Sequence, residues 1–375
     1  STIFMKNIVG DMLHFDALKD ATIALMDIDE TRLSESEAVA KKMIATMGTG
    51  ATVETTTDQR RALDGADFVV TAFQIGGYDP CTITDFDLPK RYGLRQTIAD
   101  TLGVGGIMRG LINTWALAER YPQIKQVGLC HSVQNTVQEL AHDLDMDQAD
   151  FRYKVAGVNH VAFFLKLEDA RGNSLYPRLS EGYRAGRLPK PPLLMPRCPN
   201  TLRYEVMEHL GYFCTESSEH LAEYVPWFIK RDRPDLIEEQ QAAWKEQAKA
   251  LQSASEIAVP KSHEFAAEIM NAITTDTAYV AYGNLPNTGQ IPQLPLGAAV
   301  ETPCLVDAGG VQPSVVTDIP PQLVALMRSQ INVQELTVRA LIDQNPDHIT
   351  HAAMMDPHTA AELDLRQIRA LIDDL

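Results

Sequence analysis

Short apolar runs alternate with segments of helical periodicity along the first part of the chain. Residues 22–27 indicate a buried strand that ends in an acid, and residues 34–47 have the spacing of an amphipathic helix. Further strands are predicted at 67–73 and 126–130, and a pair of extended runs at 153–167. Alternation of strands and helices favours an α/β fold with a parallel, doubly wound sheet.

The pattern changes after residue 170. A proline-rich run at 188–192 indicates a surface loop. Residues 203–210 have helical spacing, and the tail from Pro320 is predicted to be largely helical with a break at Pro357. The length of 375 residues allows two domains of ordinary size.

Composition and charge narrow the classes of partner. Hydrophobic residues make up 45% and charged residues 22% of the chain, as in ordinary folded proteins. The net charge of -17 argues against nucleic acid and against anionic membranes. There is no apolar run of about 18 residues and no signal-peptide layout at the start, so we expect a cytoplasmic location.

The cysteines predict neither a disulfide framework nor a zinc ribbon, because their number is odd and none forms a Cys-x-x-Cys pair. They are Cys81, Cys130, Cys198, Cys214 and Cys304. Any metal would therefore use isolated ligands.

One candidate pair of such ligands is Cys130 and His160. Cys130 ends one predicted strand and His160 follows the next, and adjacent parallel strands would bring the two strand ends together. A thiolate and an imidazole could then share a divalent ion. The alternative is a buried, apolar cysteine and a turn histidine with ordinary hydrogen bonds.

Other polar segments also allow two interpretations. Asp27, with Asp29 behind it, closes a strand where dinucleotide-binding folds place a ribose-binding acid, although acids at strand ends are also common in plain loops. Residues 74–78 form a glycine-containing turn that could let the backbone approach a ligand, or could be an ordinary tight turn. Residues 100–106 form a glycine-rich loop that opens a helix and could favour an anion.

An acidic cluster in the second half could bind metal or transfer protons, or could simply begin a solvated helix. Its members are Glu216, Glu219, His220 and Glu223. The neighbouring residues Tyr224, Pro226, Trp227 and Phe228 form an aromatic patch suited to a sugar face or a subunit contact.

Taken together, these segments resemble glycoside hydrolase family four, the NAD- and manganese-dependent glycosidases, and within it the melibiase-type α-galactosidases. The matching segments, in family order, are 1–4, 25–29, 72–78, 96–103, 127–132, 157–160, 215–228 and 351–358. The resemblance implies a Rossmann-like, doubly wound parallel sheet with a second mixed α+β domain, as in lactate and malate dehydrogenases. It places an NAD-binding domain at 1–157 and a catalytic, substrate and oligomerisation domain at 158–375.

The resemblance also implies roles for individual residues. NAD would contact Ser1, Thr2, Asp27, Asp29, Arg32, Phe73 and Gln74. Mn²⁺ would be held by Cys130 and His160, the catalytic residues would be Asp100 and His131, and the substrate would meet Asn113, Asn159 and His131. The metal assignment favours the ligand interpretation of Cys130 and His160 over the alternative.

The implied reaction departs from the two-carboxylate scheme of most glycosidases. NAD⁺ would oxidise C3 of galactose, a base would remove the C2 proton while the metal stabilises the enediolate, and the C1 group would be eliminated. Water addition and hydride return would complete the cycle. The partner is a small α-galactoside, and a homodimer or homotetramer is expected.

The chain departs from the family pattern at several points. The base tyrosine expected after residue 224 is absent up to Tyr279, the Asn-Pro strand expected at 111–112 is absent, and no glycine turn precedes Ser1. We expect omitted segments rather than true deletions. Two other hypotheses stay open, an NAD-dependent dehydrogenase of a hydroxy acid or sugar and a catalytically silent nucleotide- or sugar-binding relative.

Overall fold

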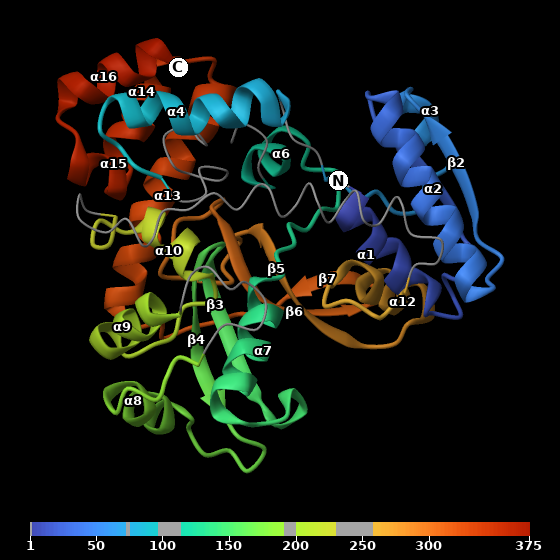
Figure 1. Ribbon diagram of the computed structural model, residues 1–375, viewed down its shortest axis with the longest axis horizontal. Helices are drawn as coiled ribbons and strands as arrows, with labels where there is room; N and C mark the ends of the chain where they lie inside the picture. The colour runs from blue at the N-terminus through green and yellow to red at the C-terminus, as the bar shows by residue number, and fades with distance from the viewer. Residues whose placement is uncertain (1, 73–75, 97–113, 191–199, 230–257) are drawn as a thin grey trace. The chain divides into compact units, whose positions relative to one another are not determined.

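The computed structural model describes residues 2–72, 76–96, 114–190, 200–229 and 258–375. These residues divide into two compact units, each built from segments that are far apart in the sequence (Figure 1). Unit 1 contains the described residues among 2–72, 258–281 and 305–312. Unit 2 contains the described residues among 76–229, 282–304 and 313–375.

Unit 1 contains a parallel pair of strands covered by helices. Strand β1 (Thr22–Met26) pairs with β2 (Thr52–Thr56), with Thr22 opposite Thr52. The helices of this unit are α1 (Thr2–Leu13), α2 (Glu30–Met47), α3 (Gln59–Leu63) and α12 (Ala266–Thr275). Buried side chains such as Ile23 and Met43 join β1 to α2. The strand predicted at 22–27 and the helix predicted at 34–47 are confirmed.

The larger sheet belongs mainly to unit 2 and has the order β4-β3-β6-β5, with β7 beside β6. Its strands are β3 (Arg152–Val158), β4 (Val161–Glu168), β5 (Tyr279–Pro286), β6 (Ala299–Asp307) and β7 (Gly310–Pro313). β3 runs antiparallel to both β4 and β6. The extended runs predicted at 153–167 are therefore confirmed as an antiparallel hairpin, which Figure 1 shows as two neighbouring green arrows.

Helices make up much of the rest of unit 2 and contribute to its core. They are α4 (Ile83–Arg91), α6 (Thr114–Arg120), α7 (Ser132–Leu144), α8 (Tyr176–Arg184), α9 (Thr201–Leu210), α10 (Ser218–Tyr224), α13 (Pro321–Ile342), α14 (Asp347–Met355), α15 (Pro357–Glu362) and α16 (Leu365–Asp374). Short turns of helix also occur at Gly77–Thr82 and Gln148–Asp150. The helix predicted at 203–210 and the helical tail are confirmed.

The longest helix anchors the hairpin. α13 packs against both β3 and β4, and it contributes Leu323, Met327 and Ile331 to the main hydrophobic core. α14 packs against α13 and α16, and α4 contacts α16, so these elements gather near the C-terminus (Figure 1). Pro357 begins α15 directly after its N-cap, Asp356, which explains the predicted break.

Two predicted strands are wrong in the part of the chain that the structure describes. Residues 67–72 form no strand, and Phe68, Val69 and Val70 are exposed. Residues 126–130 make only an isolated bridge, between Gly128 and Asn284. Apolar runs favour a strand, but a strand also needs a hydrogen-bonded neighbour along its length. The parallel pair β1–β2 therefore gains no described partner from either of these two runs.

None of the described helices is both long enough and apolar enough to cross a lipid bilayer.

Candidate active site

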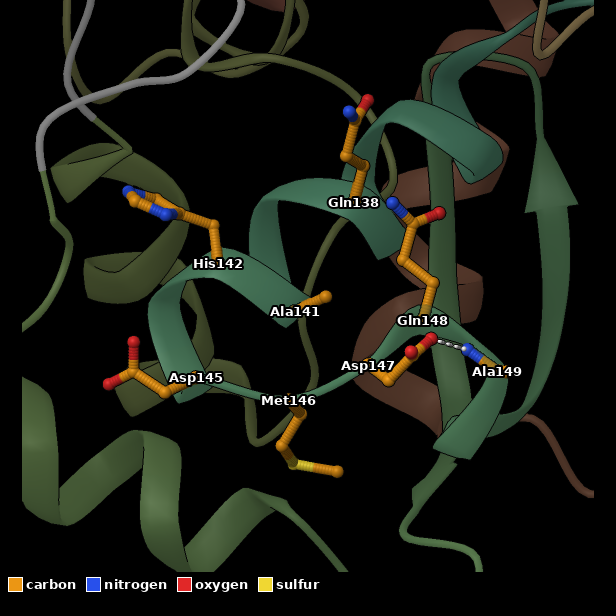
Figure 2. Close-up of a pocket in the computed structure, with 8 residues that line it drawn as sticks. All are labelled: Gln138, Ala141, His142, Asp145, Met146, Asp147, Gln148 and Ala149. Carbon is orange, nitrogen blue, oxygen red and sulfur yellow. Dashed lines mark hydrogen bonds between the residues drawn. The ribbon is translucent and has the colours of Figure 1, made fainter. Parts of the chain in front are cut away.

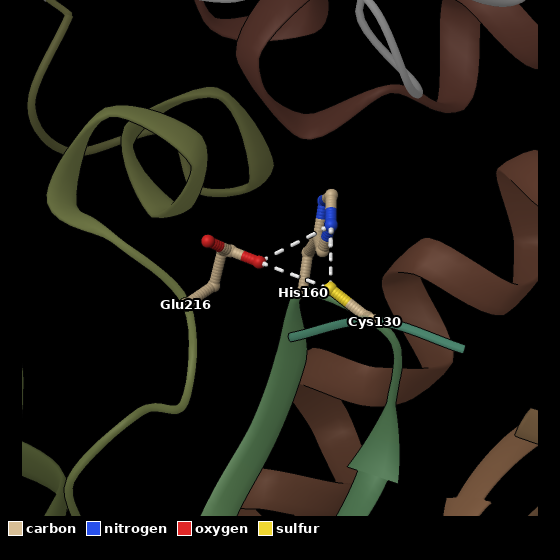
Figure 3. Close-up of side chains that lie close together, drawn as sticks. All are labelled: Cys130, His160 and Glu216. Atoms are coloured by element: carbon tan, nitrogen blue, oxygen red, sulfur yellow. Dashed lines mark hydrogen bonds and ion pairs between the residues drawn. The ribbon is translucent and has the colours of Figure 1, made fainter. Parts of the chain in front are cut away.

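Three side chains of unit 2 converge on one point, as Figure 3 shows: Cys130, His160 and Glu216. The Cys130 Sγ lies 3.8 Å from His160 Nε2 and 3.8 Å from Glu216 Oε2. His160 Nε2 and Glu216 Oε2 are 3.2 Å apart. A sulfur, a nitrogen and an oxygen, each able to bind a cation, thus face the same small volume.

His160 is placed by the turn between β3 and β4. Asn159 and His160 form a two-residue connection between Val158 and Val161, and His160 has a positive φ of 66°. This conformation is uncommon for a side chain with a Cβ, although histidine adopts it more readily than most residues. Gly157 lets the hairpin close, because a Cβ there would lie 2.6 Å from the Ala162 Cα. The hairpin therefore projects the imidazole from its tip.

Cys130 and His160 meet for a different reason from the one predicted. We expected adjacent parallel strands, but β3 and β4 are antiparallel and the segment before Cys130 makes only the Gly128–Asn284 bridge. Cys130 instead lies two residues before α7, a helix that buries one face in unit 2. The predicted proximity is present, and the predicted parallel pairing is wrong.

Glu216 lies on a third segment of the chain, which runs beside β4. Cys214 bridges to Phe163, and the Thr215 N–H donates to the Ala162 carbonyl at 3.0 Å. α10 begins two residues after Glu216. The sequence showed this acidic cluster but gave no sign that Glu216 would join the cysteine and the histidine, because the contact depends on tertiary pairing.

Neighbouring side chains orient these groups. His160 Nδ1 lies 2.9 Å from the Tyr224 hydroxyl, and Glu216 Oε1 accepts from the Ser217 N–H at 2.8 Å. His220 approaches Glu216 Oε1 at 3.4 Å, and its ring packs edge-on against His160 with centroids 4.7 Å apart. If Nε2 of His160 binds a metal, Nδ1 carries the proton and donates it to Tyr224.

Burial dominates the electrostatics of the three groups. It raises the pKa of Cys130 far above its usual range, with a further contribution from Glu216, and it lowers the pKa of His160, so both are neutral at pH 7. Burial also opposes ionisation of Glu216, but His160, His220 and the Ser217 N–H outweigh it and lower the pKa of this carboxyl. A bound cation would reverse the state of the thiol, since a coordinating thiol loses its proton.

The donor set fits a divalent metal ion. Separations of 3.2–3.8 Å between donor atoms agree with ligands that each lie about 2.0–2.3 Å from a shared ion. The carboxylate is the donor type that suits manganese, whereas thiolate and imidazole are softer donors. The side-chain carbonyl of Asn159 is buried beside His160 without a hydrogen-bond partner, and it could accept one from a ligand.

In unit 1, the structure brings together three of the residues predicted to bind NAD. Arg32 donates to the Asp27 carboxylate through Nε at 3.1 Å and Nη2 at 2.8 Å, and the Asp29 N–H donates to Asp27 at 2.9 Å. Arg32 holds the pKa of Asp27 below its usual range. Asp29 accepts from the N–H groups of Thr31 and Arg32 and so caps α2.

The other predicted site residues divide into two groups. His131 is half-buried at the start of α7, and its side chain makes no capping hydrogen bond to the helix. Thr2 begins α1, and Ser1, Phe73, Gln74, Asp100 and Asn113 lie outside the described residues. The structure therefore places Cys130, His131, Asn159 and His160 in one region of unit 2.

A surface pocket lies at the other end of α7, and Figure 2 shows its lining. The lining residues are Gln138, Ala141, His142, Asp145, Met146, Asp147, Gln148 and Ala149. Asp147 uses its carboxylate to accept the Ala149 N–H at 2.9 Å. None of the residues predicted to be functional lines this pocket.

Comparison with known proteins decides the family. Residues 1–113 match the description "Family 4 glycosyl hydrolase" and residues 155–359 match "Family 4 glycosyl hydrolase C-terminal domain". The chain belongs to glycosyl hydrolase family 4. The resemblance stated from the sequence is thereby confirmed, and both the cysteine–histidine pair and the acidic cluster lie in a family 4 protein.

Individual relatives of this family 4 chain cover nearly all of it. It is 36% identical to an alpha-galactosidase of Bacillus subtilis, in an alignment that includes 100% of this chain and 95% of that enzyme. It is 26% identical to an alpha-galactosidase of Rhizobium meliloti, covering 99% of this chain and 85% of that enzyme. The first alignment extends over 418 positions, more than the 375 residues here, so it contains positions without a counterpart in this chain.

The fold is also that of the family. A 6-phospho-beta glucosidase from Thermotoga maritima, solved with manganese, NAD⁺ and glucose-6-phosphate, has a TM-score of 0.78 and 19% identity to this family 4 chain. The match covers 100% of this chain and 95% of that one. The predicted fold class, a Rossmann-like domain with a second mixed domain, is confirmed.

Proposed function

We propose that this family 4 protein is an NAD- and manganese-dependent α-galactosidase. The observation that carries the proposal is the convergence of Cys130, His160 and Glu216, whose donor atoms are spaced for one divalent ion. Support comes from the two alpha-galactosidases that match almost the whole chain, and from the related glucosidase solved with manganese and NAD⁺. The substrate would be an unphosphorylated α-galactoside.

The protein residues would prepare the site for the metal and the sugar. His160 offers a neutral Nε2, Glu216 offers an ionised oxygen, and Cys130 offers sulfur once its proton is lost. A divalent ion held there supplies Lewis-acid polarisation of sugar hydroxyl oxygens. Asn159 would accept a hydrogen bond from a sugar hydroxyl through its unpartnered carbonyl, and His131 would act as an acid or sugar contact beside Cys130.

The remaining assignments complete the proposal. Asp27, Asp29 and Arg32 would contact the adenosine ribose, with Ser1, Thr2, Phe73 and Gln74 also at the cofactor. Asp100 would assist proton transfer and Asn113 would contact the sugar. We place NAD binding in residues 1–157 and the catalytic, substrate and oligomerisation functions in residues 158–375. A cytoplasmic location and a homodimer or homotetramer are proposed with them.

The test is hydrolysis of an aryl α-galactoside by the full chain with NAD⁺ and Mn²⁺. We expect release of the aryl group, loss of activity on chelation, restoration by Mn²⁺, and no net formation of NADH. Cys130→Ser and His160→Ala should each lower Mn²⁺ affinity at least ~10-fold. Cys81 lies outside the three-residue cluster, so the Cys81→Ser variant should bind Mn²⁺ as tightly as the natural protein does.

Other outcomes would identify the competing hypotheses. NADH formed in proportion to the substrate consumed would indicate a dehydrogenase. Binding of NAD and Mn²⁺ in calorimetry, with no turnover of any aryl glycoside, would indicate a silent binding protein. Full hydrolysis after exhaustive chelation would exclude a metal role for Cys130 and His160.

A further inference from the structure

A buried arginine lies behind the segment that carries Glu216. Arg203, on α9, is 1% exposed. Its Nη1 donates to the Thr136 hydroxyl at 2.7 Å, and its Nη2 donates to Asn200 Oδ1 at 2.6 Å and pairs with Glu139. The guanidinium carbon lies 5.1 Å from the centre of the Phe213 ring. Three segments of unit 2 therefore meet at this one side chain.

The hydrogen bonds continue from Arg203 to Glu216. The Thr136 hydroxyl, on α7, donates to the Thr215 carbonyl at 2.5 Å. Thr215 precedes Glu216, and its N–H donates to the Ala162 carbonyl of β4 at 3.0 Å. Because Cys130 lies just before α7 and His160 just before β4, Thr215 joins the segments that carry all three donors of the cluster.

Burying the charged guanidinium of Arg203 carries a large desolvation penalty. A buried ion pair often contributes no more stability than apolar residues of similar volume. Burial alone would lower the pKa of Arg203, but the charge of Glu139 outweighs it, so the guanidinium keeps its charge. Arg203 also favours the ionised form of Glu216, as the smallest of the contributions that lower the pKa of this carboxyl. Packing alone does not explain an arginine here.

We propose that Arg203 is a positioning residue that sets the Glu216 carboxylate against Cys130 and His160 through Thr136 and Thr215. The inference rests on the proposed function in one respect, namely that these three residues bind the divalent ion. It adds that the affinity for this ion depends on a side chain that does not touch it.

The experiment measures Mn²⁺ binding to the metal-free full chain, by electron paramagnetic resonance of the free ion. Thr136→Val keeps the side-chain shape and removes the hydroxyl. The double variant Arg203→Met with Glu139→Met removes the ion pair without leaving an unpaired charge. The matched control is Arg184→Met with Glu208→Met. These changes remove an ion pair that also involves α9, but whose arginine is largely exposed.

We expect Thr136→Val to raise the Mn²⁺ dissociation constant several-fold and the Arg203/Glu139 double variant to raise it about 10-fold or more. Combining both changes should add little, because they interrupt the same series of contacts. Arg203→Lys should recover part of the affinity, since lysine keeps the charge but not the fork of donors. The control pair should bind as tightly as the natural protein, and circular dichroism should show that every variant is folded.

The inference is overturned if the folded Arg203/Glu139 variant binds Mn²⁺ like the natural protein, if the control weakens binding equally, or if the effects of Thr136→Val and the double variant are additive. Failure of the proposed function looks different. In that case the natural protein itself binds no Mn²⁺ at the site, or Cys130→Ser leaves its binding unchanged, and the inference falls with it.

Discussion

At the scale of single residues, His160 connects local backbone geometry to chemistry. A positive φ at a residue with a Cβ costs roughly 1–2 kcal/mol, and such conformations persist where the surroundings hold them. Here the hairpin fixes the backbone and the Tyr224 hydroxyl fixes the ring, so Nε2 faces Cys130 and Glu216. The backbone and the ring of His160 are thus both held by contacts within the protein.

The first prediction concerns the hydrogen bond between His160 Nδ1 and the Tyr224 hydroxyl. Tyr224→Phe removes the hydroxyl that fixes His160 Nδ1, and loss of such an outer contact typically costs 10–100-fold in metal affinity. We expect the Mn²⁺ dissociation constant to rise by about 10-fold, with little change in the melting temperature. Titration of the metal-free protein with Mn²⁺ measures the first quantity and calorimetry the second.

A control separates orientation of the ring from loss of a buried hydroxyl. Tyr282→Phe removes another largely buried tyrosine hydroxyl, which donates to the Tyr153 carbonyl at 3.3 Å. It should leave Mn²⁺ affinity unchanged. Equal losses in the two variants would mean that Tyr224 acts only through general packing.

At the scale of elements, helix α2 shows one residue with two candidate roles. Asp29 caps the helix by accepting the N–H groups of Thr31 and Arg32, and it is also proposed to contact the ribose of NAD. Asparagine caps a helix about as well as aspartate, but it lacks the charge. The two roles can therefore be separated by substitution.

We predict that Asp29→Asn weakens NAD binding several-fold without changing thermal stability. Asp29→Ala should weaken NAD binding and also destabilise unit 1 by about 1 kcal/mol, because the cap is lost. Asp58 offers a matched control, since it caps the short helix α3 in the same unit by accepting from Arg60 and Arg61. Asp58→Ala should lose stability alone. Unchanged NAD affinity in Asp29→Asn would remove Asp29 from the cofactor site.

The elements also show what the sequence could and could not predict. Helical spacing predicted α2, α9 and the helical tail, because this signal is local. The run at 67–73 has the apolar composition of a strand, yet its described residues pair with no other strand. Whether a neighbouring strand is present depends on the tertiary structure and cannot be predicted from local composition. Cys130 and His160 were paired from their places at predicted strand ends, and the family resemblance then favoured them as metal ligands. Glu216 joins them only through tertiary contacts around Thr215.

At the scale of the whole molecule, acidic groups outnumber basic ones, and the net charge is -17. A negative net charge gives no long-range attraction for an anionic substrate, so it fits the proposed neutral sugar better than a phosphorylated one. One acidic side chain also lies in the interior. Glu301 of β6 is fully buried, and neither of its carboxylate oxygens has a hydrogen-bond partner. Such a group links the stability of the fold to pH.

The last prediction follows from Glu301. Burial, with the charge of Glu216 added, raises the pKa of Glu301 to about 8 from an ordinary value of 4.5. Between these two pH values the folded state keeps a proton that the unfolded state has lost, so the free energy of unfolding falls as pH rises. The contribution is complete below pH 4.5, declines as the pH rises, and levels off above pH 8. The total loss is at most about 5 kcal/mol.

Glu301→Gln removes this titration. Urea unfolding of the metal-free protein, followed by circular dichroism between pH 5 and 9, should show a steeper loss of stability with pH in the natural protein than in the variant. Glu181→Gln, which changes a largely exposed carboxyl of the same unit, should keep the natural slope. Parallel pH profiles for the natural protein and Glu301→Gln would mean that Glu301 ionises freely in the fold and that a partner for its charge exists.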